Sequence, residues 1–337
     1  MQISNWIFRG YDWQKNDMIK LNLSNTTSFA SHRSGWSYCM SCLAPAHSKS
    51  GIYFDDFLEK AFSWSIKDYY HYHSNNIPYK KDWIGVIHNP PGVPDWFDSC
   101  NSPQAIIQRD LFQKSLKTCK ALVSLSEYVA EFLRSKVDVP VISVKHPTEI
   151  PDKKWSMDNF VSQKRKEVVQ LGYWLRIMRS IYYLKCDYKY KKIWLPGDTE
   201  KAPKMLQKEL HYKNLSVLED EYNLSGVFID RVSNEEYDDL FSRCVCLVNL
   251  FDTSANNAVV ECVARNTPIL INRLPAAEEY LGKDYPLFFN DLDHASSLLY
   301  DIDKIYEAHV YLKNMDKRWI SGFYFANDLT SKLESVM

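Results

Sequence analysis

The sequence predicts an α/β fold with two Rossmann-like domains, each built on a parallel sheet. Short apolar runs, of the kind found in fully buried parallel strands, alternate with segments of helical spacing along most of the chain. The alternation pauses at residues 149–166, which are polar and charged, and then restarts. We therefore expect two sheets joined by a linker at these residues, and a length of 337 residues is sufficient for two domains that each have a core.

The composition argues against several classes of protein. Apolar residues make up 45% of the chain and charged residues 25%, as in ordinary soluble globular proteins. The formal net charge of −1 gives no support to a nucleic-acid partner, which usually needs a basic face. The 22 tyrosines and 10 tryptophans suit a sugar-binding cleft, because aromatic rings stack on the apolar faces of sugars, but they equally suit ordinary packing.

The eight cysteines are scattered without a disulfide framework, and several lie in apolar runs, which predicts a reduced, cytoplasmic protein. Cys39 and Cys42 have C-x-x-C spacing, but no second pair with zinc spacing lies nearby, so we expect no metal or redox site there. We see no signal-peptide pattern and no apolar run of membrane-spanning length. We expect any membrane contact to be peripheral, at the inner face of a membrane.

Residues 1–150 are predicted to form the first Rossmann-like domain, opened by a strand, a small-residue loop and a helix. A proline-rich loop begins at His88, directly after a buried strand, and Ser126 is expected to cap a helix. In chain order, we expect a strand at 36–43, a helix at 52–64, a strand at 83–87, a helix at 111–118, a strand at 121–125, a helix at 127–135 and a strand at 141–144.

Residues 151–304 are predicted to form the second domain, and helices in residues 305–337 are expected to pack back on the first. Ser233 and Glu236 have the spacing of a capping box. In chain order, we expect a strand at 168–171, a helix ending at 183, strands at 192–195 and 227–229, a helix at 237–243, a strand at 245–250, a helix ending at 266, a strand at 267–271 and helices in 294–337.

The stretch from Cys246 to Gly282 is the centre of the functional argument. An apolar strand ends at the polar residues 252–254 and is followed by a helix with a buried stripe. Open parallel sheets bind ligands at the carboxyl ends of their strands, and the free N–H groups of a helix start suit a phosphate. We therefore expect an anionic ligand near Asn256, at the start of this helix.

This stretch resembles the donor-binding segment of retaining GT-B glycosyltransferases, especially family 4 of their classification. That family has two glutamates eight positions apart, the second on the helix, followed by a small residue, Thr and Pro. Glu261 matches the second glutamate and residues 266–268 match the turn, whereas Thr253 occupies the position of the first glutamate and Asn256 replaces a glycine. The resemblance covers residues 168–290 and implies two sheets whose carboxyl ends face a cleft.

The family carries a basic pair after a glycine, which the resemblance places at Arg176 and Arg179, past Gly172. A guanidinium can hold a departing diphosphate through two hydrogen bonds, so the resemblance implies that role for both arginines. The alternative is that both are solvated on the first turn of a helix. His88 is expected to contact the transferred sugar, or to be a structural histidine bonded to loop backbone.

The resemblance implies that Glu261 binds the ribose of a nucleotide, with a surface glutamate as the alternative. Asn256 and Asn257 are expected to contact phosphate or sugar, or to cap the helix. Thr253 is expected in the donor site, and Glu279 falls in a loop that contacts the donor in the family, although the paired glycines of that loop are missing here.

No dinucleotide fingerprint, Walker A sequence or nucleophile elbow is present, and we expect no cofactor. The D-x-D pairs at 291–293 and 301–303 lie near helix starts, where aspartates are more often caps, and we expect no metal. We expect a hexosyltransferase-type glycosyltransferase that moves a sugar from a nucleotide-diphosphate donor to a glycan or glycolipid, as in polysaccharide biosynthesis, with retention. A nucleotide-sugar epimerase of the same architecture and a glycan-binding domain without turnover remain as alternatives.

Overall fold

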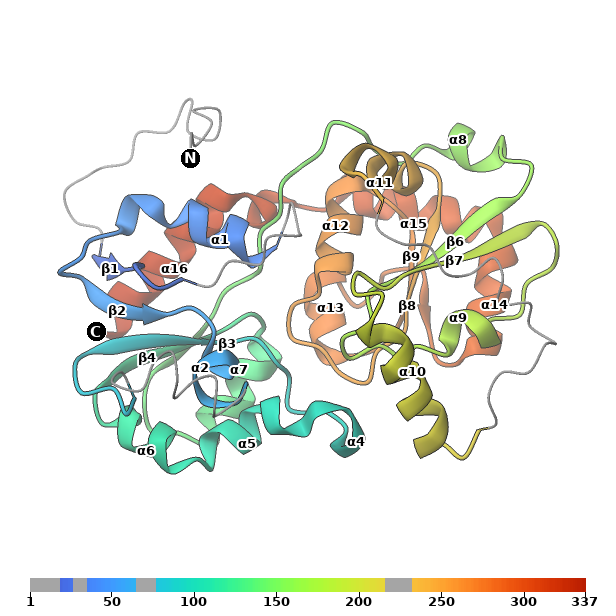
Figure 1. Cartoon of the computed structure of the whole chain (residues 1–337). Coiled ribbons are helices and arrows are strands. Elements are labelled where there is room, and N and C mark those ends of the chain that lie inside the picture. The colour runs from blue at the N-terminus through green and yellow to red at the C-terminus, as the bar shows by residue number, and fades with distance from the viewer. Residues whose placement is uncertain (1–18, 27–34, 65–76, 216–231) are drawn as a thin grey trace.

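The computed structural model describes residues 19–26, 35–64, 77–215 and 232–337, which form two lobes with one parallel sheet each (Figure 1). This architecture confirms the predicted α/β class with two parallel sheets. In the N-terminal lobe the strands lie in the order β1 (Leu21–Asn22), β2 (Ile52–Asp55), β3 (Trp83–Ile87), β4 (Cys119–Ser124) and β5 (Val141–Ser143). In the C-terminal lobe the order is β10 (Phe288–Phe289), β9 (Ile269–Asn272), β8 (Val245–Val248), β6 (Lys166–Leu171) and β7 (Tyr190–Leu195).

The strand predicted at residues 36–43 is wrong, because this segment begins with the helix α1 (Trp36–Cys42). Its buried residues are Trp36, Cys39, Met40 and Cys42, and Leu43 directly after it is also buried. Of these, Trp36, Cys39, Met40 and Leu43 follow the i, i+3, i+4, i+7 spacing of one helix face. The apolar content of the segment is therefore that of a buried helix, and its period decides between the two structures.

The helix predicted at residues 52–64 is also wrong over its first part. Ile52 to Asp55 form β2, and a helix begins only at α2 (Leu58–Phe62). Strand β2 pairs with β1 on one side and with β3 on the other, so the sheet satisfies its backbone groups on both edges. Strand β1 has two residues and was not predicted.

The strand predicted at 83–87 is confirmed as β3 with the same bounds, and the other elements predicted in the first half are present with shifted ends. Ser126 caps α7, and its Oγ accepts a hydrogen bond from the N–H of Val129 at 3.3 Å, as expected. The remaining helices of this lobe are α4 (Asp95–Asp98), α5 (Pro103–Ile107), α6 (Asp110–Leu116) and α7 (Glu127–Arg134).

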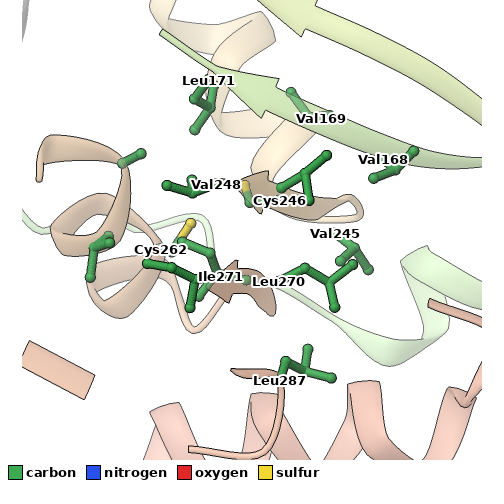
Figure 2. Close-up of a cluster of buried hydrophobic side chains, with 14 of the residues drawn as sticks. Val168, Val169, Leu171, Val245, Cys246, Val248, Cys262, Leu270, Ile271 and Leu287 are labelled. Carbon is green, nitrogen blue, oxygen red and sulfur yellow. The ribbon is translucent and has the colours of Figure 1, made fainter. Parts of the chain in front are cut away.

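The C-terminal lobe contains the predicted elements in the predicted order, but α10 (Lys201–Tyr212), α13 (Pro275–Leu281) and β10 were not predicted. Glu279, which was expected in a loop, lies on α13. Ser233 and Glu236 form the expected capping box, while the strand predicted at 227–229 lies outside the described residues. Figure 2 shows the core between β6, β8 and β9, where Val169, Cys246 and Ile271 lie among buried aliphatic side chains. The helices are α8 (Met157–Val161), α9 (Ser180–Tyr183), α10 (Lys201–Tyr212), α11 (Asn234–Phe241), α12 (Asn257–Arg265), α13 (Pro275–Leu281), α14 (Leu292–Tyr300) and α15 (Ile302–Asn314).

Strand β6 has β7 on one side and β8 on the other, so the strand order reverses at β6. At such a switch point, the loops that leave neighbouring strands diverge and a crevice opens at the carboxyl ends of the strands. The loops after β6 and β8 therefore border the expected ligand site of this lobe.

The last helix, α16 (Gly322–Val336), crosses to the N-terminal lobe and lies beside α1 (Figure 1). Its side chains Phe325, Ala326, Leu329 and Leu333 belong to the core of that lobe. Helix α15, by contrast, contributes Ile305, Ala308 and Leu312 to the core of the C-terminal lobe. The chain thus crosses between the lobes twice, at residues 149–166 and again before α16.

Candidate active site between the lobes

A cavity of about 50 Å³ lies where the loops after β3, β6 and β8 meet. These loops follow the carboxyl ends of their strands, which is where open parallel sheets bind ligands. The structure thereby brings together His88, Arg176, Thr253 and Asn256 from the set predicted from the sequence. The lining residues are His88, Asn89 and Pro90 from the N-terminal lobe and Trp174, Leu175, Arg176, Asp252, Thr253, Ser254, Ala255 and Asn256 from the C-terminal lobe.

A larger open groove of about 750 Å³ lies along residues 149–153. Of its eight lining residues, four are acidic and one, Lys153, is basic. This balance opposes a diphosphate, because like charges repel within a groove. The lining residues are Tyr38, Glu149, Ile150, Pro151, Asp152, Lys153, Glu235 and Asp238.

Arg176 lies in the loop between β6 and α9, and its guanidinium is fixed by three acceptors. Nε donates to the carbonyl oxygen of Leu171 at 3.0 Å, and Nη1 to that of Trp174 at 2.7 Å. Nη2 donates to Oδ1 of Asn256 at 3.0 Å. All three acceptors are neutral, and no ion pair within the described part of the chain includes Arg176.

Burial lowers the pKa of Arg176 to about 10, a shift that the nearby Tyr237 opposes. The side chain is therefore still a cation at neutral pH. A partly buried cation held by neutral groups is stabilised by an anion that arrives in the cavity. Arg176 is thus the strongest anion-binding group among the residues that line the cavity.

Gly172 lies directly beside the guanidinium of Arg176. Its φ of +71° is a conformation that favours glycine. A Cβ added there would lie 3.4 Å from Nη2 of Arg176. The predicted donor-site glycine therefore acts by giving the chain its turn and the arginine its space.

Helix α12 begins at the cavity. The Oδ1 atom of its N-cap, Asn256, accepts from the N–H of Ala258 at 3.0 Å as well as from Arg176. The first N–H groups of a helix lack intrahelical partners, and they carry the positive end of its dipole. Asn257 is the first residue of this helix and does not line the cavity, whereas Thr253 lines it and is buried.

His88 faces the cavity from the N-terminal lobe. Its Nε2 lies 2.9 Å from the carbonyl oxygen of Asp56, which assigns the proton to Nε2 in the neutral ring. The ring stacks on Phe57 at 4.0 Å and contacts Trp36 edge-on at 4.4 Å. Burial lowers the pKa of His88 to about 3, so the ring is neutral at physiological pH.

Glu261 is buried on α12, and its carboxylate accepts a hydrogen bond from the hydroxyl of Tyr237 on α11. Arg265, one turn further along α12, lies with its guanidinium 5.5 Å from the centre of the Tyr237 ring. Glu261 is therefore no surface glutamate, and it lies outside the set of residues that line the small cavity.

Two predicted residues are engaged elsewhere. Arg179 forms an ion pair with the buried Glu209 on α10, whose carboxylate also accepts from the backbone N–H of Arg179. The carboxylate of Glu279 accepts from the N–H of Glu127 at 2.9 and 2.8 Å, at the start of α7 in the other lobe. Neither side chain lines the small cavity.

Asp252 and Tyr237 were not among the predicted site residues. Asp252 is buried, and its Oδ2 accepts from the N–H of Gly92 at 2.7 Å and from the hydroxyl of Tyr128 at 3.0 Å, both in the N-terminal lobe. Burial raises the pKa of Asp252. Its place directly after a buried strand was a signal for a role at the site, whereas Tyr237 carried no such signal.

The D-x-D and C-x-x-C patterns of the sequence belong to helices in the structure. Asp291 and Asp301 cap α14 and α15 by accepting from the N–H groups of His294 and Lys304. Cys39 and Cys42 lie on α1 as free thiols. Within the described ranges, no cluster of three or more His, Cys, Asp or Glu side chains suited to a metal is present, and no helix is long and apolar enough to cross a bilayer.

No protein-family model and no curated protein sequence matches the chain. Among solved structures, HepE of Anabaena in complex with UDP-glucose is similar with a TM-score of 0.55 and 10% identity, over 75% of this chain and 72% of HepE. A sucrose-phosphate synthase from Thermosynechococcus elongatus is similar with a TM-score of 0.57 and 12% identity, over 84% of this chain and 72% of that one.

The trehalose-6-phosphate synthase OtsA is similar with a TM-score of 0.53 and 12% identity, over 89% of this chain and 76% of that one. All three are GT-B glycosyltransferases. The chain therefore has the GT-B fold, as the sequence predicted, and at 10–12% identity the likeness shows the fold alone.

Proposed function

We propose that the protein is a glycosyltransferase that uses a nucleotide-diphosphate sugar as donor. The observation that carries this proposal is Arg176, a partly buried cation held by three neutral acceptors, beside the start of α12 in the crevice between the lobes. The fold supports it, because the similar structures include HepE with UDP-glucose and a trehalose-6-phosphate synthase with UDP-2-fluoro glucose.

In this proposal, Arg176 and the first N–H groups of α12 hold the diphosphate of the donor. When the bond between C1 of the sugar and the phosphate oxygen breaks, its electron pair stays on the diphosphate. The guanidinium and the helix start stabilise the negative charge that develops there. Asn256 orients Arg176 through the 3.0 Å hydrogen bond, and Gly172 provides the space in which the guanidinium lies.

The acceptor hydroxyl attacks C1 and loses its proton. In a transfer with retention, this proton goes to the departing phosphate oxygen, so the step needs no side-chain base. The neutral ring of His88 is suited to contact the sugar through Nδ1, which has no hydrogen-bond partner within the described residues, while Nε2 faces the carbonyl oxygen of Asp56. We propose a glycan or glycolipid as acceptor and a reaction without a metal, at the cytoplasmic face of a membrane or in the cytoplasm.

Glu261 is proposed to bind the ribose, and Thr253 and Asn257 to lie near the sugar and phosphates. Arg179 and Glu279 are not included in the catalytic set. The charge of Arg179 is matched by Glu209, and the carboxylate of Glu279 is occupied by the start of α7.

The test is turnover of uridine, adenosine and guanosine diphosphate sugars by the purified protein, with release of the nucleoside diphosphate as the readout. Arg176→Ala should lower kcat by about 100- to 1,000-fold, the scale of about 2.7–4 kcal/mol for one preorganised charge partner. Arg176→Lys keeps the charge but loses the planar fork, so it should retain part of the activity.

The same assay separates the alternatives. Interconversion of the donor sugar without release of the nucleotide would indicate an epimerase. Binding of glycans without any turnover would indicate a glycan-binding domain. Unchanged kcat in Arg176→Ala would remove the proposed role of this residue.

A further inference from the structure

Residues 90–97 follow β3 of the N-terminal lobe in the chain, but they pack against the C-terminal lobe. Its side chains Val93 and Phe97 are buried, and they belong to the hydrophobic core of the C-terminal lobe. The ring of Phe97 lies 5.0 Å from that of Trp174, in the loop after β6. We call residues 90–97 the plug.

Trp96, in the same segment, adds further aromatic contacts with the C-terminal lobe. The ring of Trp96 lies 5.6 Å from Phe251, which follows β8, and stacks on Tyr212 of α10 at 5.7 Å. In Figure 1, α4, which contains Trp96, reaches across to α10 of the other lobe. Such ring pairs are attractive beyond the burial of their area.

A polar contact fastens the inner end of the plug. The N–H of Gly92 donates to Oδ2 of Asp252 at 2.7 Å. A Cβ added to Gly92 would lie 2.5 Å from the same oxygen, and the three nearest atoms to that Cβ all belong to Asp252. Glycine is needed here because any larger residue collides with the carboxylate.

Two further contacts hold the lobes together next to the plug. The hydroxyl groups of Ser126 and Ser254 lie 3.2 Å apart across the lobes. The carboxylate of Glu279 accepts a hydrogen bond from the N–H of Glu127 at the start of α7. The lobes are thus closed on each other through apolar, aromatic and polar contacts at once.

The space that remains is too small for the donor. The cavity between His88, Arg176 and Asn256 has a volume of about 50 Å³. Sites for small organic ligands have volumes of about 300–1,000 Å³. A nucleotide-diphosphate sugar therefore has no room between Arg176 and the N-terminal lobe in this arrangement.

We propose that the plug closes the donor site in the absence of a nucleotide, and that the donor binds only after residues 90–97 have withdrawn from the C-terminal lobe. This inference rests on the proposed function, because it assumes that a nucleoside diphosphate binds at Arg176 and α12. The measured dissociation constant is then the intrinsic one divided by the fraction of molecules with an open crevice.

The first test links the closed lobes covalently. In the double variant Ser126→Cys, Ser254→Cys, the two thiols replace hydroxyls that already face each other at 3.2 Å, so mild oxidation should join them. We expect the oxidised variant to bind uridine, adenosine and guanosine diphosphates at least tenfold more weakly than the same protein after reduction. The single variant Ser126→Cys, oxidised in the same way, is the matched control and should bind as the parent does, because Ser126 does not line the cavity.

Equal binding by the oxidised and reduced double variant would overturn the plug and leave the proposed function intact. Failure of the thiols to link in the nucleotide-free protein would also overturn it, because the lobes would not be closed. If the reduced protein and the parent bind none of the three nucleotides, the proposed function fails and the plug fails with it.

The second test opens the crevice. Gly92→Ala should displace the plug from Asp252 and bind the nucleotides several-fold more tightly than the parent. In an Asp252→Gly background the Oδ2, Cγ and Cβ atoms that collide with the added methyl group are all absent, so Gly92→Ala should then have no further effect. Affinity of the single variant that is unchanged or weaker, with an intact circular dichroism spectrum, would overturn the inference.

Discussion

Glu261→Gln is the substitution that tests the donor site most directly, because it changes one charge and almost no volume. Glu261 is buried on α12, five positions after the N-cap Asn256. At a rise of about 1.5 Å per residue, it lies about 7.5 Å along the helix from a phosphate bound at the helix start. A ribose that follows this phosphate comes within reach of the carboxylate.

The expected loss follows from the hydrogen bonds that the change weakens. A carboxylate can accept from both ribose hydroxyls, and hydrogen bonds to charged groups contribute about 1.5–3 kcal/mol each. The side-chain oxygen of glutamine can still accept the hydrogen bond that the Tyr237 hydroxyl donates to Glu261, so the variant should fold like the parent. We expect a loss of about 1–3 kcal/mol in binding, which is about 5- to 150-fold in the dissociation constant.

Calorimetry with the free nucleoside diphosphate is the appropriate assay, because it does not depend on the acceptor or on turnover. Glu131→Gln, on the exposed side of α7, is the matched control and should bind like the parent. Parent-like affinity in Glu261→Gln, with an unchanged melting temperature, would show that the ribose lies elsewhere.

Two further predictions concern pH. His88→Ala should lower kcat by the same factor at every pH from about 5 to 8, because the ring is already neutral there, and a titration near pH 6.5 that disappears in the variant would contradict this. Burial raises the pKa of Glu59 to about 7, and its Oε1 accepts from the N–H groups of His88 and Asn89 at 2.7 Å. Since the folded pKa is raised, the native state loses stability as the pH rises from about 4.5 to 7. Glu59→Gln should remove that slope, on the order of 3 kcal/mol in the free energy of unfolding, and an unchanged dependence of unfolding on pH would refute the assignment.

The second half of the fold was predictable because its strands are buried on both faces. Val168, Cys246 and Ile271 stand in short apolar runs that no other structure explains as well. The end of α12 was equally clear, since Asn266 adopts the left-handed conformation and a proline follows at position 268.

The first half was harder because its apolar segments are short. Residues 36–43 span only about two helical turns, which is too short for the helical period to stand out. The apolar run therefore resembled a strand, although the spacing of Trp36, Cys39 and Met40 is that of a helix. The strand β2 was hidden because its side chains alternate poorly and its place is fixed by pairing with β1 and β3.

The hydrogen-bond and ion-pair partners of the individual site residues could not be predicted from the sequence. The sequence predicted a role for Arg176, but not its hydrogen bond to Asn256, which comes from the loop after β8. The pairing of Arg179 with Glu209 and of Glu279 with α7 joins positions 30 and 152 residues apart. No local pattern specifies such contacts, because they depend on how the elements pack.

The loop between β8 and α12 links the donor site to the closure of the lobes. Asp252 and Ser254 face the N-terminal lobe, while Asn256 bonds Arg176 and caps α12. A ligand that binds the start of α12 and a plug that holds Asp252 therefore act on the same few residues. Linkage requires that, if closure weakens nucleotide binding, the nucleotide weakens closure by the same factor. The rate at which the Ser126 and Ser254 positions cross-link should thus fall as the nucleotide saturates the site.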